Sequence, residues 1–537
     1  MSETQTLPGQ IVFTLVFAAV LAYPLARLLL WRYVRAVEAA MRSTAPLQPA
    51  SPAAAPAGAG SSPAAAPSAP PLLPAMMQRP WRAAAAQAIV ACVLALWFAW
   101  LYLRADAIAV SPSRLLMLGI THLWPGILAV LLVAGITRRQ RVRVLAGGSA
   151  LYLVLGVLLS TQPLLPALVD ALRLWLIVNL LPTLYLAAFL TRRVRSVGPP
   201  VLLVCLLTVS GAVALLAVLA VNEAWLHAIG GLLFTLGLGA LGGLAVMALT
   251  GAALAAAVGV WLLHAIARGY AARRIGDQGL MLAALWLVFT LSYSVNLLFA
   301  GGGWFVLGLL AFPVWLLLSR LVNALLLHDD TGPAHALLLL RVFARKGNAP
   351  ALFHALSRHW RHVGPIRMIA GYDLATESVE PDELMAFLRG RLADSFVTGP
   401  DVVDRRLGDA PPRRDADVRF RAEEFFCFDD TWRYTLQRLV ATSAVVLMDL
   451  RGFGPQNRGC VFELAALAEY AALPRTVLLH DASTDMASLR AETTALGIAA
   501  DALPLLALSG DEARDLPALV AATAKAAQSS APSSGQR

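Results

Sequence analysis

The stretch AVVLMDLRGFGPQNRGCVFELAALAEYAALPRTVLLHD, residues 444–481, decides the fold of the carboxyl-terminal part of the chain. It opens with an apolar run of strand length, 444–450, and closes with a second one, 475–481. Between them lie a loop with two glycines and a proline and then a helical segment, 460–473, that is apolar nearly all round. Strands that alternate with helices in this way predict a parallel sheet covered by helices on both faces.

The same alternation extends over residues 328–529, which we expect to form one α/β domain followed by a disordered tail, 530–537. Residues 397–418 are polar and contain proline, and they predict a loop. His354, His359 and His362 are expected to form a polar helix face. The expected strands are 336–343, 366–371, 444–450, 475–481 and 503–508, and the expected helices are 349–363, 381–396, 430–443, 460–473, 486–497 and 513–527.

The rest of the chain has the composition of a membrane protein. Hydrophobic residues make up 58% of the sequence and charged residues 14%, against roughly 25% charged residues in soluble domains. The basic residues are not gathered on a soluble module, which excludes a nucleic-acid partner. The four cysteines and nine histidines show no metal-ligand spacing, so we expect neither a metal nor a bound cofactor. Arginine far outnumbers lysine, which is typical of a GC-rich bacterial genome.

Nine spans through the lipid bilayer are expected, because each needs about 20 apolar residues. The first span and its flank occupy 1–43, a disordered Pro/Ala linker follows over 44–78, and 79–327 hold the other eight spans. Arginine-rich loops alternate with loops poor in charge, which places the N-terminus outside the bacterial inner membrane and the C-terminal domain in the cytoplasm. The expected spans are 11–31, 83–103, 115–136, 144–163, 172–190, 199–221, 226–267, 279–299 and 303–326.

The segment 226–267 is the ambiguous one, since its length would allow two crossings. The alternation of charged loops favours a single crossing with an extra helix or a re-entrant piece. The interiors of the spans hold almost no ionisable residue, and the polar exceptions include Asn179 and SYSVN, 292–296. This pattern favours an anchor or a sensor over an ion-coupled transporter.

Glu463 is the strongest candidate for a functional residue. It lies near the start of the helix that follows strand 444–450, where the carboxyl ends of parallel strands bind ligands. The helix N-terminus favours its anionic form and its apolar neighbours favour the neutral form. Two interpretations stay open at this point: a functional carboxylate, or an acidic residue that satisfies the amides at the helix N-terminus.

The run from Ala444 to Leu464 resembles the TIR-domain pattern, in which an apolar strand and a short polar loop precede Cys-x-x-Glu-Leu at the start of a helix. Together with ALAEYAALPRTVLLHD it is also similar to nucleoside 2-deoxyribosyltransferases. The resemblance covers roughly 335–527, with 397–430 as an insertion, and implies a flavodoxin-like, TIR-like sheet. In both families this glutamate works at the anomeric carbon of a ribose.

The resemblance implies that Glu463 stabilises an oxocarbenium-like ribose, or attacks its C1′, as nicotinamide leaves NAD. The function implied is a membrane-anchored signalling or defence effector that binds NAD or a related nucleotide and can cleave the ribose–base bond, with homo-oligomers forming through this domain. The alternatives are a signalling or scaffold protein without turnover, or a membrane receptor or transporter with a regulatory domain. The substrate-binding residues implied are Arg341, Phe343, Tyr372, Asp373, Asp449 and Arg451.

Overall fold

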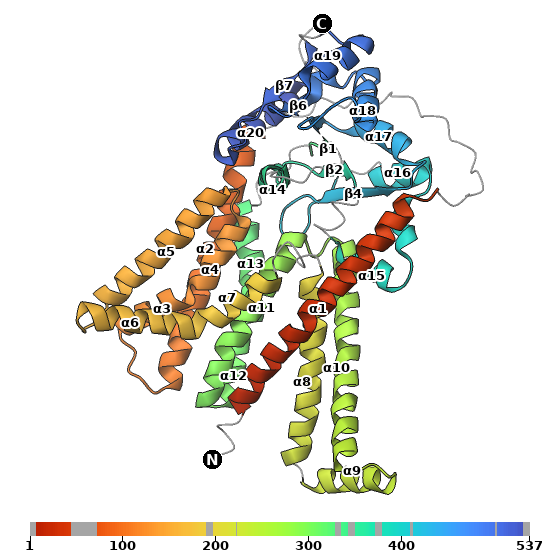
Figure 1. Ribbon diagram of the computed structural model, residues 1–537. Coiled ribbons are helices and arrows are strands. Elements are labelled where there is room, and N and C mark those ends of the chain that lie inside the picture. Colours follow the sequence, from red (N-terminus) through yellow and green to blue (C-terminus); the bar gives the residue numbers. More distant parts are fainter. Residues whose placement is uncertain are drawn as a thin grey trace.

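The structure, a computed structural model, divides into a helical part and a part built on a sheet (Figure 1). Long apolar helices form the first part, and the strands with their covering helices form the second. The residues described are 7–44, 72–189, 197–221, 223–327, 334–341, 349–370, 379–408, 412–499 and 502–529.

The sheet has seven parallel strands in the order β3-β4-β2-β1-β5-β6-β7. Its central strands are continuous apolar runs without polar alternation, as expected for strands covered on both faces. All five residues of β5 are buried. The strands are β1 (Leu337–Arg341), β2 (Ile366–Ile369), β3 (Phe396–Val397), β4 (Ala422–Cys427), β5 (Val445–Asp449), β6 (Thr476–His480) and β7 (Leu505–Ala507).

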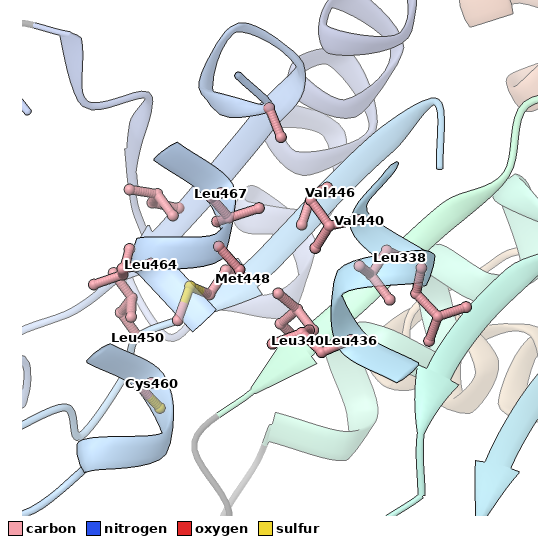
Figure 2. Packing of buried hydrophobic residues seen from close by; sticks show 14 of the residues in the cluster. Leu338, Leu340, Leu436, Val440, Val446, Met448, Leu450, Cys460, Leu464 and Leu467 are labelled. Carbon is pink, nitrogen blue, oxygen red and sulfur yellow. The ribbon is translucent and has the colours of Figure 1, made fainter. Parts of the chain in front are cut away.

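Helices cover both faces of the sheet, which confirms the predicted parallel α/β arrangement. Alternate residues of each strand point to opposite faces, so the strands supply two separate cores. One core lies under α17, α18 and α19 (Figure 2), and the other lies under α14 and α20. The helices are α14 (Ala349–Trp360), α15 (Pro381–Leu388), α16 (Pro400–Leu407), α17 (Trp432–Thr442), α18 (Arg458–Glu469), α19 (Met486–Ala495) and α20 (Glu512–Ser529), with short 3-10 turns at Leu392–Ser395 and Leu473–Arg475.

The expected loop over 397–418 was wrong in its first part, where α16 (Pro400–Leu407) forms, whereas the described residues 412–418 contain no helix or strand. The insertion that the resemblance implies over 397–430 stays a prediction. This segment adds β3, α16 and β4, which extend the sheet beyond β2. Strand β4 reads AEEFFC, and its glutamates hid it in the sequence. In the fold Glu423 forms ion pairs with Arg367 at 3.1 Å and with Arg273 at 3.6 Å. Ion pairs with residues far away in the sequence therefore allow the charged first residues of β4 to belong to the sheet.

Among the described residues of the amino-terminal part, eight helices are long and apolar enough to cross a membrane. A ninth is counted if α3 and α4, bent by 42° relative to each other, form one span. Residues 72–78, expected in the linker, instead begin α2, whereas 45–71 lie outside the described residues. The helices are α1 (Leu7–Met41), α2 (Leu72–Ala105), α3 (Pro112–His122), α4 (Trp124–Val133), α5 (Arg138–Leu158), α6 (Leu164–Trp175), α7 (Leu181–Phe189), α8 (Gly198–Val221), α9 (Glu223–Thr235), α10 (Ala240–Ala271), α11 (Asp277–Leu297), α12 (Gly302–Leu309) and α13 (Ala311–Leu327), with a π-helical turn at Leu176–Leu180 and a 3-10 turn at Leu298–Ala300.

The ambiguous segment 226–267 forms one helix of spanning length, α10, and a shorter apolar helix, α9. Helices α8 and α10 run side by side, and α9 lies across their far ends (Figure 1). The two long helices approach closely where Gly211 faces Gly251, because a Cβ on either would overlap the backbone of the other helix. Small residues of this kind allow close packing of helices in a membrane. The expectation of one crossing with an extra helix therefore agrees with the helix lengths.

A buried polar network joins several of the apolar helices. Asn179 lies on the π-helical turn, accepts a hydrogen bond from the Tyr293 hydroxyl at 2.7 Å and donates one to the Thr121 carbonyl at 3.0 Å. Next to Thr121, His122 is buried where α3 bends into α4 and is enclosed by the rings of Phe98, Tyr102 and Tyr293. The polar residues that stand out in the sequence of the spans thus meet in the interior of the helical part.

Buried arginines of the sheet domain fasten it to the turn between α10 and α11. Arg361 donates to Asp277 at 2.9 Å, and the Tyr270 hydroxyl donates to the same carboxylate at 2.6 Å. Arg421, just before β4, pairs with Asp415 at 2.9 Å and stacks on the Tyr270 ring. A guanidinium that leaves water must be paired in this way, so the turn and the sheet domain constrain each other.

Removing the Asp277 carboxylate should destabilise the protein. The buried Arg361 guanidinium would lose its carboxylate partner, and breaking one side of a buried pair costs about 3 kcal/mol or more. We expect Asp277→Ala to lower the unfolding free energy of the full-length protein in detergent by that amount. Asp404→Ala is the control, since Asp404 and Arg438 form an exposed pair at 3.0 Å that contributes less than about 1 kcal/mol. Equal losses in the two variants would contradict the role given to Asp277.

Candidate functional site

The candidate site lies at the carboxyl edge of the sheet, where β1 and β5 are neighbours. Arg341, the last residue of β1, is in register with Asp449, the last residue of β5. From β1 the chain continues to β2 on one side of it, whereas β5, β6 and β7 lie on the other side. The strand order therefore reverses between β1 and β5, and in open parallel sheets ligands bind at the carboxyl edge next to such a reversal.

Glu463 is carried to this edge by α18, the helix that directly follows β5. Its position in the second turn puts it on the same helix face as Cys460, Leu464 and Leu467, which pack on the sheet (Figure 2). The Glu463 side chain is accordingly buried, with 4% of its surface exposed. A helix that carries mostly apolar residues on its inner face thus brings one carboxyl group into the interior.

The surroundings of the Glu463 carboxyl group leave it without compensation. Its Oε2 atom is buried and has no hydrogen-bond partner within the described part of the chain. Burial raises the pKa of Glu463 from 4.5 to about 8. The neutral acid therefore predominates at neutral pH. A buried polar atom without a partner costs free energy, and such a cost concentrates at functional sites.

Of the two interpretations of Glu463 that the sequence left open, one is that its carboxylate satisfies the amides at the helix N-terminus. No hydrogen bond from the backbone amides at the start of α18 to Glu463 occurs among the described residues. Asn457 stands at the N-cap position, as its residue type predicts, but its side chain accepts a hydrogen bond from the Gly454 amide at 2.9 Å instead of capping the helix. Helix capping therefore does not explain the carboxyl group at position 463.

Asp449 and Arg451 form a bidentate ion pair with each other. The Arg451 Nε and Nη2 atoms donate to the two Asp449 oxygens, both at 2.8 Å, and the Arg451 amide adds a bond at 3.1 Å. Burial opposes the charge on Arg451, but the bond to Asp449 outweighs it and raises the pKa of the guanidinium. Two predicted substrate-binding residues therefore satisfy each other and hold the turn after β5 rigid.

The thiol of Cys460 is subject to the charges of the Glu463 and Asp449 carboxyl groups. Burial, and then the charges of Glu463 and Asp449, raise the pKa of its thiol well above the ordinary value. A thiol in these surroundings stays protonated, and thiolate is the nucleophilic form. Cys460 is therefore a small buried residue and not a nucleophile, and the charges of both Glu463 and Asp449 act on it.

Four of the predicted substrate-binding residues lie partly or wholly outside the described residues. Arg341 is placed by its backbone at the end of β1, and its side chain lies outside the described residues, as do Phe343, Tyr372 and Asp373 entirely. The Trp432 ring packs edge-on against the Phe462 ring, with the two ring centres 5.2 Å apart. The structure thus brings Glu463, Cys460 and the Asp449–Arg451 pair together at one edge.

Sequence reasoning missed several groups around Arg451. The Phe353 ring of α14 lies 5.7 Å from the Arg451 guanidinium, and the charges of Asp481 and Asp515 also act on it. Asp481 directly follows the carboxyl end of β6, so the strand-end rule could have found it. Asp515 lies in α20, far away in the sequence, and no pattern in the sequence links it to the strand ends. Among the described residues no group of three or more His, Cys, Asp or Glu side chains could hold a metal ion.

Comparison with known proteins gives the chain no relative. No protein-family model, no curated protein and no solved structure matches it.

Glu463→Gln should change how the stability of the protein depends on pH. In the unfolded chain Glu463 ionises at its ordinary pKa of 4.5, and in the fold at about 8. Below pH 4.5 both states hold the proton and the group costs nothing; as pH rises toward 8 only the unfolded state ionises, so stability is lost. We expect the variant to match the wild type near pH 4.5 and to exceed it by a few kcal/mol at pH 8, as measured by denaturant unfolding. A pH-independent difference would show that Glu463 ionises normally in the fold.

Proposed function

We propose that the sheet domain binds NAD or a related nucleotide at the carboxyl edge of β1 and β5, and cleaves its ribose–base bond with Glu463. One observation carries the proposal: a buried carboxyl group, without a hydrogen-bond partner for Oε2 among the described residues, stands just after a central strand where the strand order reverses. The order β2-β1-β5-β6-β7 also agrees with a flavodoxin-like sheet. The TIR-like pattern around Cys460 and Glu463 supplies the reaction.

The charge of the substrate suits the charge state of Glu463. Burial favours the neutral acid, and a nicotinamide nucleoside carries a positive charge on the pyridinium ring beside the ribose. A nearby positive charge lowers the pKa of a carboxyl group, so substrate binding favours the carboxylate when it is needed. The bond between C1′ and the pyridinium nitrogen then breaks, and its electron pair neutralises the leaving nicotinamide.

The remaining steps follow from the positive charge left on the ribose. The oxocarbenium-like ribose is stabilised by the Glu463 carboxylate, as carboxylates stabilise the anomeric carbon in glycoside hydrolysis. Water adds to C1′ and loses its proton, which gives ADP-ribose, nicotinamide and one proton for each NAD consumed. The rigid Asp449–Arg451 pair would shape the edge of the site, because both of its charges are already paired.

The proposal places the reaction beneath a membrane anchor. The helices long and apolar enough to cross a membrane precede the sheet domain, and arginine-rich loops favour a cytoplasmic position for that domain. A domain on the cytoplasmic side of the membrane would be in the same compartment as NAD. We therefore propose a signalling or defence effector of the bacterial inner membrane, acting through homo-oligomers of the sheet domain.

The proposed reaction predicts that the full-length protein in nanodiscs converts NAD into ADP-ribose and nicotinamide. Glu463→Gln should lower the rate at least about 100-fold, because it removes the group that stabilises the charged ribose. Glu469→Gln is the matched control, since Glu469 is exposed on the same helix and its loss should leave the rate within about twofold. Chromatography of the products measures both rates. Turnover by Glu463→Gln at the wild-type rate would exclude the proposed role.

A second function, binding without turnover, is favoured by the Asp449–Arg451 pair. Its internal hydrogen bonds at 2.8 Å occupy two groups that the resemblance assigns to the substrate. A scaffold or signalling protein would then use the same edge to hold a nucleotide or a partner. Nucleotide binding by the wild type, measured by calorimetry, without any product in the same sample would support this second function over the first.

A further inference from the structure

The surface between the sheet domain and the apolar helices contains a buried histidine whose two ring nitrogens both face backbone carbonyl oxygens. His359, in the last turn of α14, has 4% of its surface exposed. Its Nδ1 lies 3.0 Å from the carbonyl oxygen of Met76 in α2. Its Nε2 lies 3.0 Å from the carbonyl oxygen of Gly135, in the turn between α4 and α5. The expected polar helix face is thus an interior contact at this position.

The donor count of the ring makes this contact depend on protonation. A carbonyl oxygen only accepts hydrogen bonds, and a neutral imidazole carries a single N–H group. The neutral ring can therefore bond to Met76 or to Gly135, and its other nitrogen then turns a lone pair toward the second oxygen. The imidazolium carries two N–H groups and satisfies both oxygens at once. Adding one proton thus converts a single link into a bridge between α2 and the α4–α5 turn.

The space around the ring is shaped for this bridge. Gly135 has no Cβ, and a Cβ there would lie 2.6 Å from both Cε1 and Nε2 of His359, which is too close for any contact. The neighbouring Arg358 adds a third link, because its Nη1 donates to the Ala134 carbonyl at 3.3 Å. On the other side Met76 packs into the core that also contains Trp360. Glycine at 135 is therefore what lets the sheet domain dock here.

The charged groups described next to this contact are cationic. Arg358 neighbours His359 in α14, and the charges of Arg419, Arg79 and Arg361 act, together with His359, on the adjacent His362. A positive charge on His359 therefore adds to a cationic neighbourhood. Several are already engaged, since Arg79 donates to the His362 carbonyl oxygen, Arg358 to Ala134, and Arg361 pairs with Asp277. The carbonyl oxygens of Met76 and Gly135, each 3.0 Å from a ring nitrogen, are the groups that stabilise the protonated ring of His359.

We propose that His359 is a proton-binding site that clamps the sheet domain to the apolar helices when its ring is protonated. The imidazolium has the two donors that the contact needs, so the clamp tightens when the ring gains a proton. Loss of the proton removes one of the two links and loosens α14 from α2 and from the α4–α5 turn. The apolar helices and the sheet domain are coupled at this point, whichever reaction the sheet domain performs.

The test compares thermal unfolding midpoints of the full-length protein in nanodiscs at about pH 6 and about pH 8. His359→Phe keeps an aromatic ring but removes both donors, and it should lose at least about 2 °C of the stabilisation that the wild type gains at the lower pH. His359→Gln keeps an uncharged amide donor and should show the same loss of pH response. His354→Gln, on the exposed face of α14, should retain the wild-type response.

A second pair of variants keeps the proposal testable if a substitution at His359 prevents folding. Gly135→Ala pushes the ring away from its carbonyl acceptor and should remove the same part of the pH response as His359→Phe, while the part expected from Glu463 stays. Gly147→Ala is its control, because a Cβ there meets no atom within 4 Å. A wild-type pH response that persists in His359→Phe, His359→Gln and Gly135→Ala would overturn the proposal, as would a wild type that shows no response between the two pH values.

Discussion

The pairing of the buried Arg361 guanidinium with Asp277 is the interaction on which the arrangement of the molecule depends. Asp277 opens α11 in the apolar part, and Arg361 follows α14 in the sheet domain, so the ion pair joins residues 84 positions apart. The Arg361 guanidinium is buried, and without a carboxylate partner its burial would cost much free energy. Tyr270 adds its hydroxyl to Asp277 and its ring to Arg421, so one turn of the apolar part holds two arginines of the sheet domain. These contacts fasten the sheet domain to the apolar part at this turn.

Helix α2 makes the same connection with apolar contacts. Its first residues, Leu72 and Met76, belong to the core beneath one face of the sheet. Residues further along the helix, from Val90 to Leu101, belong to the core of the apolar bundle. A single helix thus contributes to both cores. The His359 contact with Met76 lies on this same helix.

The candidate site uses a different property of the fold, the common direction of the strands. All strand ends of one kind meet at one edge, which collects residues from distant parts of the sequence. Glu463 is unusual there, because the fold buries its carboxyl group and leaves Oε2 without a hydrogen-bond partner among the described residues. Burial without compensation raises the pKa of Glu463 to about 8. The site therefore stores free energy that a positively charged ligand could recover.

The sequence by itself determined what depends on local pattern: the apolar helices of spanning length, the alternation of strands and helices, and the place of Glu463 after β5. Continuous apolar runs and helix-length apolar segments are sufficient for these. Only the tertiary structure decided that AEEFFC is a strand, that Asp449 and Arg451 bind each other, and that His359 faces two carbonyl oxygens. The physical reason is the same in each case. A charged or polar residue takes its place from the partner that satisfies it, and these partners come from chain direction, turn geometry or segments far away in the sequence.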